Sequence, residues 1–162
     1  MTSTTATCPA FAALAAALCK AARIAPPALA EDTSGGLGLR LELDGVLVTI
    51  THHPAQFPSH VFVYVAFGAV PASGEADAFR DLLDANLLMM RPCSPSFARD
   101  PLDGQIVLQA CCALHETSGN ALLAGIRVAV GKALEWRQAH RLSPLAREEA
   151  HAASRDYAAV FA

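Results

Sequence analysis

Residues 37–52 read LGLRLELDGVLVTITH, two short segments in which apolar and polar side chains alternate on either side of Asp44-Gly45. Leucines at 37, 39, 41 and 43 would share one face of a strand, and Val46, Val48 and Ile50 would share one face of the next. Asp-Gly is a residue pair that two-residue hairpin turns favour. The stretch therefore predicts an antiparallel hairpin with one apolar face, to which the neighbouring segments can be added.

Segments on both sides of the hairpin predict further elements. HVFVYVAFGAV at 60–70 is apolar at nearly every position, as in a central strand that is covered on both faces. Residues 9–24, 75–90 and about 120–138 carry apolar side chains at three- and four-residue spacing, which predicts three helices. Two strands, SFARDP at 96–101 and a second over 104–114, lie between the last two helices. The order α-β-β-β-α-β-β-α predicts an α+β fold with a twisted, mainly antiparallel sheet flanked by helices.

The chain has 162 residues, which is enough for one domain with its own core. We expect residues 1–142 to form that domain and residues 143–162 to add a helical tail, because Ser143-Pro144 is a good cap and first-turn pair. The N-terminal run AFAALAAALC imitates a signal peptide, but Lys20 and Arg23 fall between it and the small residues at 28–30. We therefore expect neither a signal peptide nor a membrane span.

The composition favours some classes of binding partner and excludes others. Hydrophobic residues make up 53% of the chain and charged residues 17%, so apolar surface should be left over for a partner once the core is built. The net charge is -3, and no basic cluster is interleaved with aromatic residues, so nucleic acid is not an expected partner. Five cysteines without a CxxC pair are typical of reduced thiols in a cytoplasmic protein.

A search for catalytic or metal-binding residues gives no constellation. Cys111 and Cys112 are adjacent in the strand GQIVLQACCAL, so their side chains should point to opposite faces, with Cys112 buried and Cys111 nearer to solvent. His52 and His53 end a strand without acidic or thiol partners nearby, which favours loop histidines over a metal site. We therefore expect no enzyme, no metal and no cofactor. The alternative is a small α+β ligand-binding or catalytic domain whose site the motifs do not reveal.

Three segments, taken in their order and spacing, resemble the class I type III secretion chaperones, the Tir chaperone family. LRLELDGVLVTI at 39–50 looks like the first hairpin of that family, and FRDLLDANLLM at 79–89 looks like its second helix. SFARDPLDGQIVLQACCAL at 96–114 looks like its last hairpin, which precedes a final helix that ends near Trp136-Arg137. The resemblance covers about residues 9–140.

The resemblance implies a homodimer in the bacterial cytoplasm that binds the extended N-terminal region of an effector. The dimer would keep that effector soluble and export-competent, with the secretion ATPase as a further partner and without nucleic acid or a membrane. By analogy the dimer interface contains Phe79, Leu82, Leu83, Leu87 and Met90. The effector-binding groove would contain Phe11, Leu14, Leu18, Leu39, Leu41, Val48 and Ile50. Each of these side chains could instead belong to an ordinary core, and both alternatives stay open.

Overall fold

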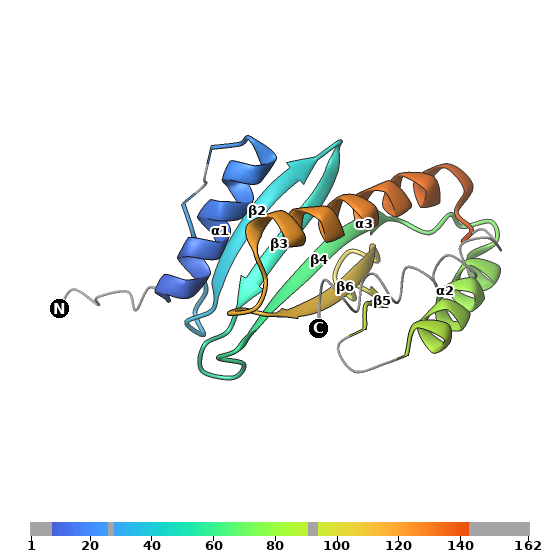
Figure 1. Cartoon of the computed structure of the whole chain (residues 1–162). Coiled ribbons are helices and arrows are strands. Elements are labelled where there is room, and N and C mark those ends of the chain that lie inside the picture. Colours follow the sequence, from blue (N-terminus) through green and yellow to red (C-terminus); the bar gives the residue numbers. More distant parts are fainter. Residues whose placement is uncertain (1–7, 26–27, 91–93, 143–162) are drawn as a thin grey trace.

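The structure is a computed structural model that describes residues 8–25, 28–90 and 94–142. Six strands of this part form one antiparallel sheet in the order β1-β2-β3-β4-β6-β5, which confirms the predicted α+β fold (Figure 1). The two-residue strand β1 was not predicted, and the predicted tail at 143–162 lies outside the described residues. The elements in chain order are α1 (Pro9–Ala22), β1 (Ala30–Glu31), β2 (Leu37–Leu43), β3 (Val46–His52), β4 (His60–Gly68), α2 (Glu75–Met89), β5 (Ser96–Arg99), β6 (Ile106–Ala113) and α3 (Gly119–Ala139).

The hairpin of β2 and β3 has the predicted turn. Leu43 pairs with Val46, and the two residues between them both have positive φ, 52° at Asp44 and 76° at Gly45. A turn that is left-handed at both central residues matches the twist of the strands, and Asp-Gly adopts it at low cost. The register places the apolar residues of both strands on the same face of the sheet.

Helices α1 and α3 cover one face of the sheet, and the core lies between them and the strands (Figure 1). Strand β4 lies between β3 and β6, so its predicted central position is confirmed. Val61, Val63 and Phe67 are buried on its core face, whereas Phe62 and Tyr64 on the other face are only half-buried. The prediction that this strand is covered on both faces is therefore wrong, because its second row of large side chains is not enclosed.

The two core helices touch at Gly119, the first residue of α3. A Cβ atom added there would lie 2.5 Å from the carbonyl carbon of Ala17 and 2.6 Å from the nitrogen of Leu18. Any residue larger than glycine at position 119 would therefore prevent the two backbones from approaching this closely. Ser118 caps this helix end, because its side-chain oxygen accepts a hydrogen bond of 3.2 Å from the backbone N–H of Ala121.

Arg137, near the end of α3, joins the helix to the far end of the sheet. Its guanidinium donates to three backbone carbonyls, Phe67 at 3.1 Å, Ala66 at 2.9 Å and Gly45 at 3.0 Å. These carbonyls belong to the end of β4 and to the turn of the first hairpin. One planar donor group thus fastens two separate parts of the sheet to the last helix.

Candidate protein-binding surfaces

The outer side of α2 carries an exposed group of large apolar side chains, which we name the α2 patch: Leu83, Leu87, Leu88 and Met90. Leu83 and Leu87 are each 68% exposed, and Met90, just beyond the helix, is 73% exposed. Their spacing of four and three residues places these three on one side of the helix axis. The opposite side of α2 is buried through Ala78, Leu82, Ala85 and Met89.

The five residues predicted for the dimer interface divide between these two sides. Leu83, Leu87 and Met90 lie together on the surface, whereas Leu82 is 4% exposed and Phe79 is half-buried against the core. Leu88, which is 40% exposed, was missed by the sequence analysis. Leu88 belongs to the same wide apolar stripe of the helix, so this stripe could have been used to add Leu88 to the predicted interface. The assignment of this surface to a dimer stays a prediction.

The residues predicted for the effector-binding groove come together in the core of the fold. None of the seven is more than 7% exposed, and all belong to one cluster of buried side chains. In this arrangement their surface is covered by α1, α3 and the sheet itself, which favours the alternative of an ordinary core role. The groove assignment stays a prediction. The seven residues are Phe11, Leu14, Leu18, Leu39, Leu41, Val48 and Ile50.

One edge of the sheet is only partly covered. The two residues of β1 pair with Leu37 and Gly38, and no other described strand pairs with the outer side of β2. In a two-residue hairpin the closing pair, Leu43 and Val46, exchanges hydrogen bonds, so alternate residues of β2 direct their backbone groups outward. Arg40 and Glu42 are such residues, and both have exposed side chains. We call this stretch the open β2 edge.

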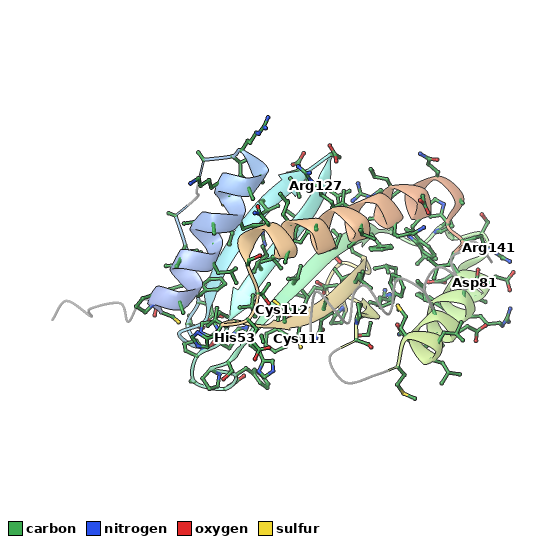
Figure 2. The ribbon with its side chains drawn as sticks, in the orientation of Figure 1. His53, Asp81, Cys111, Cys112, Arg127 and Arg141 are labelled. Atoms are coloured by element: carbon green, nitrogen blue, oxygen red, sulfur yellow. The ribbon has the colours of Figure 1, made fainter. Side chains whose placement is uncertain are left out.

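The adjacent cysteines of β6 lie as predicted, on opposite faces of the sheet (Figure 2). Cys112 is fully buried, and this burial raises the pKa of its thiol despite a hydrogen bond with Thr117 that lowers it. Cys111 is half-buried and lies opposite Phe62 of β4. Two side chains that diverge in this way cannot act together as a dithiol or a chelate.

His52 is not a loop residue, and that prediction is wrong. Its side chain continues the buried row of β3 and stacks on Phe11 of α1, with ring centroids 5.5 Å apart. The nitrogen Nδ1 lies 2.9 Å from the carbonyl oxygen of His60, so Nδ1 carries the proton and donates it. The two-residue period of the strand places His52 inside, because Val48 and Ile50 precede it on the same face.

The carboxylate of Asp32 lies in the β1–β2 connection, where it interacts with the backbone and with His53. Asp32 accepts hydrogen bonds from the backbone N–H of Ser34 and of Gly36, each at 2.8 Å, and from the Ser34 hydroxyl at 2.6 Å. These bonds hold the pKa of the Asp32 carboxyl below its usual value, with the Ser34 hydroxyl as the largest cause. Within residues 8–25, 28–90 and 94–142 no group of three or more potential ligands is arranged to hold a metal ion.

The described residues thus form a single open-edged sheet with α1 and α3 on one face and an exposed apolar side on α2. None of the helices in the described ranges is long and apolar enough to span a bilayer. Residues 21–137 match the model of the Tir chaperone protein (CesT) family. This match covers more than half of the chain, so the chain belongs to that family, and the resemblance to class I type III secretion chaperones is confirmed.

Several solved structures share this fold. The ExsC–ExsE complex matches with a TM-score of 0.63 and 22% identity, over 85% of this chain and 98% of that chain. The ExoT–SpcS complex from Pseudomonas aeruginosa matches with a TM-score of 0.57 and 22% identity, over 80% and 98%. The Yersinia pestis type III secretion chaperone SycH, in complex with a fragment of YscM2, matches with 0.54 and 16%, over 77% and 98%. No curated protein sequence matches the chain.

Proposed function

We propose that this chain binds the extended N-terminal region of a type III effector in the bacterial cytoplasm and keeps that effector soluble and export-competent. It does so as a homodimer and without catalysis. The observation that carries the proposal is the open β2 edge in a member of a chaperone family. The similar chains ExsC, SpcS and SycH were each solved in complex with another protein, which supports a binding role.

The open β2 edge suits an extended peptide for a physical reason. An unpaired strand edge presents a row of N–H and C=O groups, and a segment of another chain can satisfy them by adding a strand. Main-chain hydrogen bonds of this kind bind many sequences, as a chaperone of a disordered segment requires. A strand paired with Arg40 and Glu42 would continue the line of β1 along β2.

The α2 patch is the surface that we assign to the second copy in the homodimer. Exposed apolar side chains at this density are unfavourable in water, and a two-fold contact would bury the same patch on both chains at once. Leu83, Leu87 and Met90 retain the predicted role in this proposal, with Leu88 added to them. The secretion ATPase stays a predicted further partner.

The test is binding of a candidate effector, such as a protein encoded by a neighbouring gene, which is expressed together with this chain and shortened in steps from its C-terminal end. We expect the complex to persist in size-exclusion chromatography until the N-terminal region is cut. Arg40→Pro removes an outward N–H from the open β2 edge, so the Kd of the minimal segment should rise about tenfold, or about 1.4 kcal/mol.

Arg40→Ala is the matched control, because it removes the same side chain but keeps the N–H. It should bind as the natural chain does. Equal binding by Arg40→Pro would exclude the open β2 edge as the site, and failure of the natural chain to bind any segment would exclude the function.

A further inference from the structure

The side chain of Asn86, on α2, forms a pair of hydrogen bonds with the backbone of Phe97 in β5. The N–H of Phe97 donates to Asn86 Oδ1 at 2.7 Å, and Asn86 Nδ2 donates to the carbonyl oxygen of Phe97 at 3.0 Å. A side-chain amide carries the same donor and acceptor as a peptide group. Asn86 therefore takes the place that the backbone of a neighbouring strand would occupy.

This pair lies on the outer edge of the sheet. Strand β5 is last in the strand order and, among the strands that the structure describes, pairs only with β6, Phe97 lying opposite Leu108. The backbone groups of Phe97 bond to Asn86 and so point away from β6, whereas the N–H of Asp100 points inward to the carbonyl of Gln105 at 2.8 Å. By this alternation the outward positions of β5 are 97 and 99.

The two edges of the sheet are thus unequal. The β5 edge is only four residues long, and α2 satisfies the backbone of Phe97 there. The open β2 edge leaves Arg40 and Glu42 outward without a described strand beside them. Exposed strand edges recruit other strands unless something covers them. A partner that adds a strand therefore meets one short edge, at which Asn86 already occupies one of the two outward positions, and one open edge.

We propose that Asn86 determines where strand addition takes place. It closes the β5 edge to other strands, and it thereby directs a partner's strand to the open β2 edge; this second part rests on the proposed function. The same contact fixes the register of β5, whose Phe97 ring meets the buried Phe67 edge-on at 5.0 Å between centroids. Asn86 acts on the partner only through the edge that it occupies.

Hydrogen exchange on the natural chain, read at single amides by NMR, is the first test. The amide of Phe97 should be protected, whereas the amides of Arg40 and Glu42 should exchange at the rate of solvent-exposed groups. Exchange of the Phe97 amide as fast as that of Arg40 would overturn the proposal. This measurement requires no variant, no effector and no assumption about the dimer.

The variant Asn86→Ala is the second test, followed by light scattering over a range of concentrations. Opening the β5 edge should make the chain associate beyond the state of the natural chain and speed exchange of the Phe97 amide about tenfold or more. Adding Arg99→Pro removes the other outward N–H of β5 and should suppress this association. Unchanged light scattering and unchanged exchange in Asn86→Ala would overturn the proposal.

The matched control is Leu82→Ala, which weakens the packing of α2 through a buried side chain without touching the edge. It should not associate beyond the natural chain. If Leu82→Ala associates as strongly as Asn86→Ala, Asn86 only holds the helix in place and the proposal is overturned. The proposal is also overturned if Arg99→Pro fails to suppress the association of Asn86→Ala. Because none of these measurements uses an effector, they report on the edge alone, while effector binding reports on the proposed function.

Discussion

Cys111 and Cys112 show how strand alternation gives two identical neighbours different chemistry. The thiolate is the reactive form, and burial raises the pKa of the Cys112 thiol while also shielding it from reagents. We therefore predict that a maleimide added to the native protein at neutral pH labels Cys111 before Cys112. Peptide mass spectrometry of samples taken over time measures the two rates.

The single variants Cys111→Ser and Cys112→Ser provide the controls for this labelling. Cys112→Ser should keep the fast reaction, and Cys111→Ser should lose it without exposing Cys112. Full denaturation should bring the two thiols to similar rates. Faster labelling of Cys112 in the folded chain would contradict the assignment of the faces of β6.

His52 marks where inference from single residues goes wrong. A histidine next to another histidine and before Pro54 is typical of a loop, and chemistry alone did not indicate burial. The two-residue period of β3 did contain the information, since His52 follows Ile50 on the buried face. What no pattern could supply was its stacking on Phe11, which depends on how α1 lies over the sheet.

At the scale of the elements, the contact between α1 and α3 leads to a prediction about two glycines. Gly119→Ala would push its new Cβ into the backbone at Ala17 and Leu18, so the helices must separate. We expect this substitution to lower the free energy of unfolding by about 1–3 kcal/mol. Denaturation by urea, followed by circular dichroism, measures the change.

Gly131→Ala is the matched control in the same helix. Nothing lies within 4 Å of a Cβ added at Gly131, and alanine is the better helix former, so stability should rise by about 1 kcal/mol. Opposite signs for the two substitutions would separate tight packing from helix propensity. A stable Gly119→Ala protein would disprove the close approach of the two helices.

The elements differ in how far sequence could predict them. Periodicity predicted the first hairpin and the three long helices, because each repeats its pattern over several turns or pairs. A strand of two residues such as β1 has no period, so nothing marked it. The apolar stripe predicted helix α2 correctly but did not show which side of the helix faces the core. Leu82 and Leu83 were therefore both predicted for the dimer interface, although only Leu83 is exposed.

The predicted groove illustrates the same limit for a binding site. Alternating apolar residues in β2 and β3 indicate that one face is covered, but they do not say whether the cover is a helix of the same chain or a partner. In the structure α1 and α3 supply that cover. The open β2 edge could not be predicted from side chains at all, because it consists of backbone groups that another strand leaves unpaired.

For the whole molecule we predict a dimer that depends on the α2 patch. Leu87→Asp puts a charge in the middle of the patch, where the two-fold contact would exclude water, so the dimer should dissociate to monomers. Multi-angle light scattering at tens of micromolar measures the mass. Circular dichroism should stay unchanged, since the side chain of Leu87 is 68% exposed in the single chain.

Leu102→Asp is the control for the dimer, because Leu102 is 94% exposed and lies in the β5–β6 connection, outside the α2 patch. It should remain dimeric. A natural chain that is monomeric at this concentration would contradict the homodimer directly. A dimer that survives Leu87→Asp would place the interface elsewhere on the surface.

The pairing of α1 with α3 brings together the two ends of the described chain, and this sets the order in which the protein can fold. The apolar side of α1 is made first during synthesis, but its partner at Gly119 is made more than a hundred residues later. Arg137 reaches its carbonyl partners only after that. Contacts so distant in sequence slow folding and leave apolar surface exposed in the meantime. If the proposed function holds, a protein that keeps another chain soluble therefore passes through an exposed state of its own while the ribosome is still completing it.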